Sequence, residues 1–279
     1  MRLGGRRHSE NIEDRRGTRL GRAGGIGLGT VVLALVAAYF GVDPSIFLQN
    51  AQQGPVEQQQ VPYEESATEA QARELVSVVL ADTEDTWGQI FAASGGTYQP
   101  PMLVLFSEAV QTACGVGQSA SGPFYCPADR KVYIDLSFYE ELHQRFGAPG
   151  DFAQAYVIAH EIGHHVQTLM GISERTHAAR SRASEAEANA LSVRQELQAD
   201  CFAGLWAHTA ERSRPFLEAG DVEEGLNAAS AIGDDRLTQG RAPPESFTHG
   251  TSEQRVRWFK RGLESGSIET CDTFSARAL

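Results

Sequence analysis

The 279-residue chain lacks several features that mark common classes of protein. It has only four cysteines and no C-x-x-C pair, which argues against a cysteine-based zinc or redox site. It shows no internal repeat, and its length suits one sizeable domain or two small ones. Only one stretch, residues 24–42, is long and uncharged enough to cross a bilayer, which excludes a protein with several membrane spans.

Charge is distributed unevenly along the chain, whose formal net charge is −12. Residues 1–23 contain seven arginines against three acidic residues, whereas the remainder is strongly acidic. A basic head by itself could indicate nucleic-acid binding, but an acidic domain repels anionic polymers. We therefore expect no nucleic-acid partner.

The uncharged stretch from Gly24 to Val42 directly follows the arginines. Its length fits a transmembrane helix, and the positive-inside rule then places residues 1–23 in the cytoplasm as a basic head. A cleavable signal peptide usually has a shorter apolar core and a small-residue cleavage site, whereas this stretch ends in Tyr-Phe-Gly-Val. We expect an uncleaved single-pass anchor, a flexible linker at residues 43–66, and an extracytoplasmic domain at residues 67–279.

The four cysteines can form disulfides if the domain lies outside the cytoplasm. Cys114 and Cys126 bracket a Gly/Ser-rich loop, as the ends of a local disulfide would. Cys201 and Cys271 would then form a long-range pair. Four cysteines allow three pairings, and the sequence alone does not choose among them.

The most informative stretch of the chain is His160-Glu161-Ile162-Gly163-His164, which follows an apolar run. Residues four apart share one helical face, so His160 and His164 can bind one Zn²⁺. Glu161 would lie beside the metal, where it can take a proton from water. Because these five letters also arise by chance on a helix, a zinc site requires a further ligand elsewhere.

A third ligand is expected because catalytic zinc usually has three protein ligands. The known extension with a third histidine six residues later is absent, since Met170 holds that position. Glu196 and Asp200 provide a different solution, with Glu196 as ligand and Asp200 accepting the second ring N–H of a ligating histidine. His165 would point roughly 100° away around the helix, as a supporting or surface residue. Other candidate ligands, none with an Asp four residues later, are Glu185, Glu187 and His177.

The order of the expected elements indicates an α+β domain, with a small sheet before the zinc helix and helices after it. A helix is expected at residues 68–93, a buried strand at 102–106 and a half-exposed strand at 131–136. The later helices are expected at residues 151–170, with Asp151 as N-cap, and at 181–211, 221–232 and 252–264.

Segments along almost the whole chain carry a family resemblance. They are Met1-Arg2, Asn11 through Gly17, Gly122 through Pro127, the His160 and Glu196 elements, Phe247 through Ser252, and Cys271 through Phe274. In this order they resemble the neutral zinc metallopeptidases of the YpfJ type, a bacterial family. The resemblance implies a zincin-like, gluzincin-like metallopeptidase domain, associated with the bacterial cell membrane and acting on a peptide or protein substrate.

The chemistry expected from this site is zinc-assisted hydrolysis of a peptide bond, with Glu161 as general base. The oxyanion of the intermediate needs a donor, for which His249 in a polar loop is the candidate; a plain surface histidine is the alternative. The segment 132–136 is the candidate edge strand for pairing with a substrate, against an ordinary internal strand. Residues that could assist or replace His249 are Arg255, Arg257, Tyr125, Tyr133, Tyr139 and Tyr156.

Two other functions stay open: an inactive zinc-binding scaffold tethered to the membrane, and a zinc hydrolase acting on a non-peptide substrate. The presence of Glu161 favours the peptidase, because a scaffold needs no general base. An intramembrane protease is disfavoured, because Gln154, Gln167 and two adjacent histidines make the zinc helix too polar for lipid.

Overall fold

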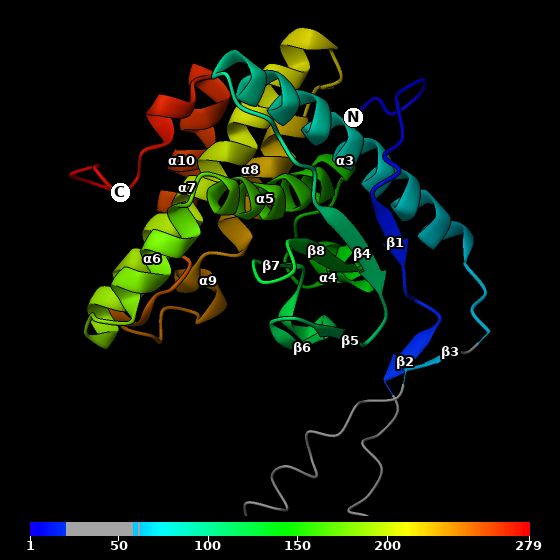
Figure 1. The fold of residues 1–279 in the computed structure, drawn as a ribbon, viewed down its shortest axis with the longest axis horizontal. Helices are drawn as coiled ribbons and strands as arrows, with labels where there is room; N and C mark the ends of the chain where they lie inside the picture. The colour runs from blue at the N-terminus through cyan, green and yellow to red at the C-terminus, as the bar shows by residue number, and fades with distance from the viewer. Residues whose placement is uncertain (21–57, 61) are drawn as a thin grey trace, which may run out of the picture.

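The structure is a computed structural model that describes residues 1–20, 58–60 and 62–279 (Figure 1). Its strands are β1 (Ile12–Asp14), β2 (Thr18–Leu20), β3 (Gln58–Gln60), β4 (Met102–Phe106), β5 (Ala109–Thr112), β6 (Gly115–Gln118), β7 (Phe124–Cys126) and β8 (Lys131–Asp135). Its α-helices are α3 (Ala67–Ala93), α4 (Ser137–Gln144), α5 (Asp151–Leu169), α6 (Ile172–Arg180), α7 (Glu185–Ser213), α8 (Asp221–Ala231), α9 (Asp234–Leu237) and α10 (Ser252–Ser265). The α+β prediction is confirmed.

The central sheet has four strands in the order β1-β4-β8-β7. β4 is parallel to both β1 and β8, and β7 runs antiparallel to β8. Because β8 lies between two other strands, the prediction of an edge strand at residues 132–136 is wrong, and residues 132–135 are all buried. Among the described strands of this sheet, the edge on the side of β8 is β7.

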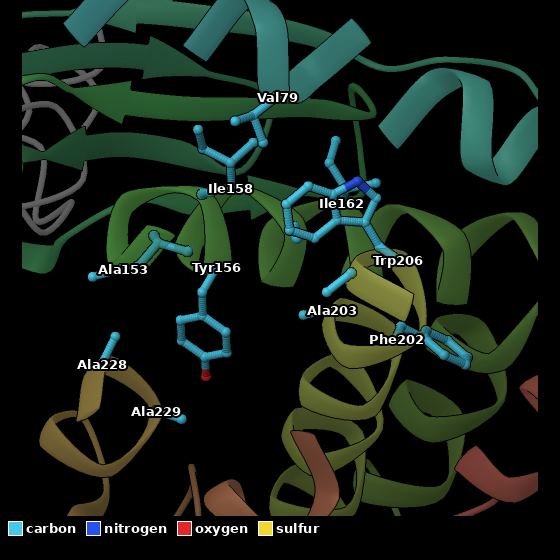
Figure 2. Close-up of a cluster of buried hydrophobic side chains, with 14 of the residues drawn as sticks. Val79, Ala153, Tyr156, Ile158, Ile162, Phe202, Ala203, Trp206, Ala228 and Ala229 are labelled. Atoms are coloured by element: carbon cyan, nitrogen blue, oxygen red, sulfur yellow. The ribbon is translucent and has the colours of Figure 1, made fainter. Parts of the chain in front are cut away.

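Helix α5 runs through the middle of the domain. Figure 2 shows Ile158 and Ile162 directed toward Val79 of α3, whereas Tyr156 points into the space between α7 and α8. An α-helix that is apolar on several sides is one that other elements surround. The surrounding elements explain why the residues before His160 are apolar, and they fix the position of α5.

Helices α7 and α10 begin at capping boxes that the local sequence encodes. At the start of α7, Ser184 accepts from the backbone N–H of Glu187, whose carboxylate accepts from Ser184. Thr251 and Gln254 form the same arrangement at α10. Such caps satisfy N–H groups that have no partner within the helix. Helix α5 differs from prediction, because its N-cap is Gly150 and Asp151 is the first helical residue.

Helices α5 and α7 cross closely at a glycine. A Cβ atom on Gly163 would lie 3.0 Å from the Cα atom and 3.0 Å from the carbonyl oxygen of Ala199. A residue larger than glycine would therefore push the two helices apart. This crossing lies one residue from His164 on α5 and one residue from Asp200 on α7, so it sets the distance between the two halves of the site.

The disulfides follow one of the three pairings that the sequence left open. Cys114 is bonded to Cys126, and Cys201 of α7 is bonded to Cys271. The first disulfide closes the β5–β6 hairpin onto β7. The second fixes the chain after α10 to the residue that follows Asp200.

Residues 1–20 pack against the domain, which corrects the prediction of a separate basic head at residues 1–23. Strand β1 is part of the central sheet, with Ile12 beside Leu103 and Asp14 beside Leu105. The predicted span 24–42 lies outside the described residues, as does most of the linker predicted at 43–66. None of the helices described is long and apolar enough to cross a bilayer.

Candidate metal centre

The site begins with two histidines on one face of α5. The rings of His160 and His164 lie 4.8 Å apart between centroids, almost perpendicular to each other. His160 is 5% exposed, and Glu161 next to it is 8% exposed. The spacing of four residues therefore places both imidazoles on one face of α5, as the sequence predicted, and both rings face one point.

Glu196 of α7 faces both histidines. Its Oε2 atom lies 3.2 Å from Nε2 of His160, and its Oε1 atom lies 3.4 Å from Nε2 of His164. In a tetrahedral zinc site with bonds of about 2.0–2.1 Å, neighbouring ligand atoms are about 3.3–3.4 Å apart. The two distances involve different oxygens of one carboxylate, and they place that carboxylate about as far from each imidazole as two ligands of one metal ion would be. Within the part of the chain that is described, His160, His164 and Glu196 form a group able to hold a metal ion.

The other nitrogen of each ring is held by a hydrogen-bond acceptor. Nδ1 of His160 lies 2.8 Å from Oδ1 of Asp200, and Nδ1 of His164 lies 2.9 Å from Oε1 of Gln167. Acceptors at both Nδ1 atoms keep the proton there and leave the Nε2 lone pairs free for a metal. The residues present therefore fit a zinc ion.

Asp200 is fully buried within a polar network. Arg255 of α10 donates to it twice, from Nε and from Nη2, each at 2.8 Å. The hydroxyl of Tyr156 donates to Oδ1 at 2.5 Å. Burial alone would raise the pKa of Asp200, but Arg255 and His160 outweigh it and lower that pKa to about 2. Asp200 therefore stays ionised and accepts all of these donors.

Glu161 and His160 respond to burial in opposite ways. Burial raises the pKa of Glu161, and the neighbouring His164 and His160 offset only part of that rise. Burial lowers the pKa of His160, but Asp200 and Glu196 raise it to about 10, so a zinc ion would have to displace a proton from Nε2. A carboxylate with a raised pKa is a better proton acceptor than an ordinary one, which suits Glu161 to general-base chemistry.

A cavity of about 470 Å³ opens in front of these residues. One part of its wall is apolar, including Phe138 of α4, Phe146, Val157 and Ile232. Another part is the segment from Ala120 to Tyr125, which ends in the edge strand β7. A second hollow, which shares His164, Glu196 and Tyr125 with the first, continues toward His177 and Arg180 of α6. The surface is therefore hollowed on both sides of His164 and Glu196.

His249 lines the first cavity together with His160, His164, Glu196 and Glu161. Its Nδ1 lies 3.2 Å from Oδ1 of Asp234, and its backbone N–H donates to Oδ2 of the same carboxylate. The hydrogen bond to Asp234 raises the pKa of His249, against a smaller lowering by burial. The imidazole of His249 therefore points into the cavity from a loop that Asp234 holds in place.

Other residues considered from the sequence lie elsewhere or act differently. Arg255 reaches the site but is tied to Asp200, whereas Arg257 binds the carbonyl of Leu279 and Glu253. Glu187 caps α7.

His165 is 1% exposed, which excludes a surface role; its ring contacts the Tyr125 hydroxyl and the Gln99 carbonyl. Of the tyrosines, Tyr125 and Tyr156 line the cavity, and Tyr133 and Tyr139 do not.

The role of Asp234 and the position of Gln167 were missed by reasoning from the sequence. Gln167 is three residues after His164, a spacing at which helical side chains meet, so its hydrogen bond could have been found. Asp234 is fifteen residues before His249. The carboxylate of Asp234 also accepts from the backbone N–H groups of Thr248 and Gly250, and no short spacing in the sequence indicates such a loop.

A family model described as "Putative neutral zinc metallopeptidase" matches residues 1–274. The chain is 53% identical to the "Uncharacterized protein YpfJ" of Escherichia coli (strain K12), over 98% of this chain and 99% of that protein. It is 40% identical to the "Uncharacterized protein Rv2575" of Mycobacterium tuberculosis (strain H37Rv), over 76% of this chain and 75% of that protein. No solved structure matches the chain.

Proposed function

The chain belongs to the family described as "Putative neutral zinc metallopeptidase", and on that basis we propose that it is an endopeptidase with one zinc ion held by His160, His164 and Glu196. The observation that carries this proposal is the position of Glu196, whose oxygens lie 3.2 and 3.4 Å from the two Nε2 atoms. When bound, zinc would supply a Lewis acid that polarises the scissile carbonyl and acidifies water.

The protein's own residues would move the proton. Glu161 takes a proton from the attacking water as the new C–O bond forms, and then delivers it to the amine as the C–N bond breaks. Its burial and raised pKa support this role. His249 donates a hydrogen bond to the oxyanion that forms on the carbonyl oxygen. Asp200 and Gln167 hold the ligating imidazoles in position through their Nδ1–H groups.

Two features support cleavage within a chain rather than at its end. The hollows on either side of His164 and Glu196 give room for residues both before and after the scissile bond. The edge strand β7 borders the cavity, so a substrate in extended form can pair with its backbone. We propose β7, in place of β8, as the strand that binds the substrate.

The test uses the full chain, its zinc content and its hydrolysis of internally quenched peptides. We expect about one zinc per chain and cleavage between internal residues. Glu161→Gln should keep the metal and lose activity by a factor of about 10²–10⁴. Glu196→Ala should lose the metal. Glu185→Gln, an exposed carboxylate on the same helix, is the matched control and should change neither.

Two results would contradict the proposal. Unchanged zinc content in Glu196→Ala would mean that the third ligand is misassigned. A zinc-loaded chain that cleaves no peptide in a broad library would favour a zinc-binding scaffold or a hydrolase with another class of substrate.

A further inference from the structure

The segment that precedes the predicted membrane span is an integral part of the domain that follows it. Backbone hydrogen bonds hold both ends of β1. The N–H of Leu103 donates to the carbonyl of Asn11 at 2.8 Å, and the backbone N–H of Arg15 donates to the carbonyl of Leu105 at 2.7 Å. Residues 1–20 therefore supply one edge strand of the sheet that contains β8 and β7.

The arginines of this segment pair with carboxylates of the protein. Arg6 lies 2.7 Å from Asp82, and Arg7 lies 2.8 Å from Glu84, and both of these acids belong to α3. Asp82 is 6% exposed and Glu84 is 9% exposed. Ser9 and Asn11 also donate to Glu84. Without residues 1–20, the buried Glu84 would lose the partners Arg7, Ser9 and Asn11, which is costly. Asp82 would lose Arg6 but keep Trp206 and Arg214.

The chain leaves and re-enters the described structure at adjacent points. β2 and β3 form an antiparallel pair in which Leu20 lies opposite Gln58 and Thr18 opposite Gln60. Figure 1 shows the two strands side by side at one end of the molecule. Arg16 adds an ion pair with Glu65 at 2.7 Å, just before α3. Because paired strands lie about 4.7–4.9 Å apart, the backbone at Leu20 lies next to the backbone at Gln58.

A single membrane crossing between residues 20 and 58 is incompatible with this pairing. Crossing the hydrocarbon core displaces the chain by about 30 Å, whereas Leu20 and Gln58 are neighbours. A return crossing by residues 43–57 would place Asp43, Glu57 and several glutamines in lipid, in a segment too short and too polar for a transmembrane helix.

We infer that residues 1–20 and the domain of residues 58–279 lie on the same side of any membrane that the chain contacts. Three arginines before the predicted span, Arg6, Arg7 and Arg16, pair with Asp82, Glu84 and Glu65, which requires both sets of residues to lie on the same side of a membrane. The two disulfides place that common side outside the cytoplasm.

The test compares the accessibility of two introduced cysteines in the full chain within intact bacterial cells. Gly4→Cys lies in an exposed turn where an added Cβ meets no atom within 4 Å, and Glu264→Cys is exposed on α10. His8→Cys, also exposed, replaces Gly4→Cys if that variant fails to accumulate. A membrane-impermeant maleimide is applied before and after permeabilisation, with a cytoplasmic protein as the unlabelled control.

We expect the Gly4→Cys and Glu264→Cys chains to be labelled equally in intact cells. Labelling of Glu264→Cys alone, with Gly4→Cys reacting only after permeabilisation, would overturn the inference and restore a single crossing. Equal labelling that requires permeabilisation would support the common side but overturn its extracytoplasmic location.

Discussion

At the residue scale, Asp200 serves three neighbours at once: a ligating histidine, a buried arginine and a tyrosine hydroxyl. Replacing it with Asn keeps the shape of the side chain but removes the charge. We expect Asp200→Asn to weaken zinc binding by about 10–100-fold, because the imidazole of His160 is no longer oriented by a carboxylate. Competition with a chelator of known affinity measures this. Glu253→Gln, an exposed acid on α10, is the control and should leave affinity unchanged.

Arg255, the buried cation that pairs with Asp200, should affect the stability of the protein as well. Arg255→Met leaves a fully buried carboxylate without its main cation. Breaking a buried pair in this way costs about 3–5 kcal/mol. Thermal or urea unfolding of the zinc-free protein measures the loss. An Arg255→Met chain as stable as wild type would show that Tyr156 and His160 satisfy Asp200 by themselves.

The pH dependence of activity tests the proposed role of His249 as the donor to the oxyanion. Asp234 raises the pKa of His249, so the imidazolium persists to higher pH than usual. If the protonated ring stabilises the oxyanion, activity falls as pH rises through that pKa. Asp234→Asn lowers the pKa of His249, and the alkaline limb of kcat/KM should therefore move to lower pH. An alkaline limb that stays in place in this variant would exclude His249 as the titrating group.

At the element scale, the crossing of α5 and α7 determines whether the ligands meet. Gly163→Val would force Ala199 away, since even a Cβ lies 3.0 Å from its backbone. We expect weaker zinc binding together with lower stability, because the displacement moves Glu196 relative to His160 and His164. Gly88→Ala on α3 is the control, because nothing lies within 4 Å of its Cβ. That change should stabilise the protein by about 0.5–1 kcal/mol.

Elements with strong local signals were predictable. The HExxH pair, the carboxylate of Glu196 that faces it and the long helices follow from periodicity and capping. The position of β8 was not, because the alternating pattern of residues 131–136 predicted a half-exposed strand, whereas residues 132–135 are all buried. Strand β1 was missed for a different reason: its charged flanks indicate solvent, and only the acids of α3 reveal that they pair inside the protein.

At the scale of the whole molecule, residues 1–20 should be necessary for the fold. A chain of residues 67–279 alone loses β1, the arginine beside Glu84 and one of the two arginines beside Asp82, where Arg214 remains. The loss of one such buried pair costs about 3–5 kcal/mol. For a domain of this size, that corresponds to a Tm lower by roughly 6–20 °C. Calorimetry of the truncated and full chains gives the comparison.

A second deletion provides the matched control. Leu20 and Gln58 are opposite each other in an antiparallel pair, so an Asn-Gly turn can replace residues 21–57 as a two-residue hairpin loop. This chain keeps every described contact of residues 1–20 and should keep its Tm and its zinc. If it unfolds as readily as the truncated chain, residues 1–20 do not stabilise the domain as the structure indicates.

The bond between Cys201 and Cys271, together with the pairing of Arg255 with Asp200, has a consequence for biosynthesis. A ribosome that has reached residue 200 has already produced His160, His164 and Glu196, the candidate ligands, together with Tyr156. Arg255 and Cys271, which also hold Asp200 and its neighbour in place, are added only later. We therefore expect a nascent polypeptide that ends before Arg255 to carry the candidate ligands without these two supports.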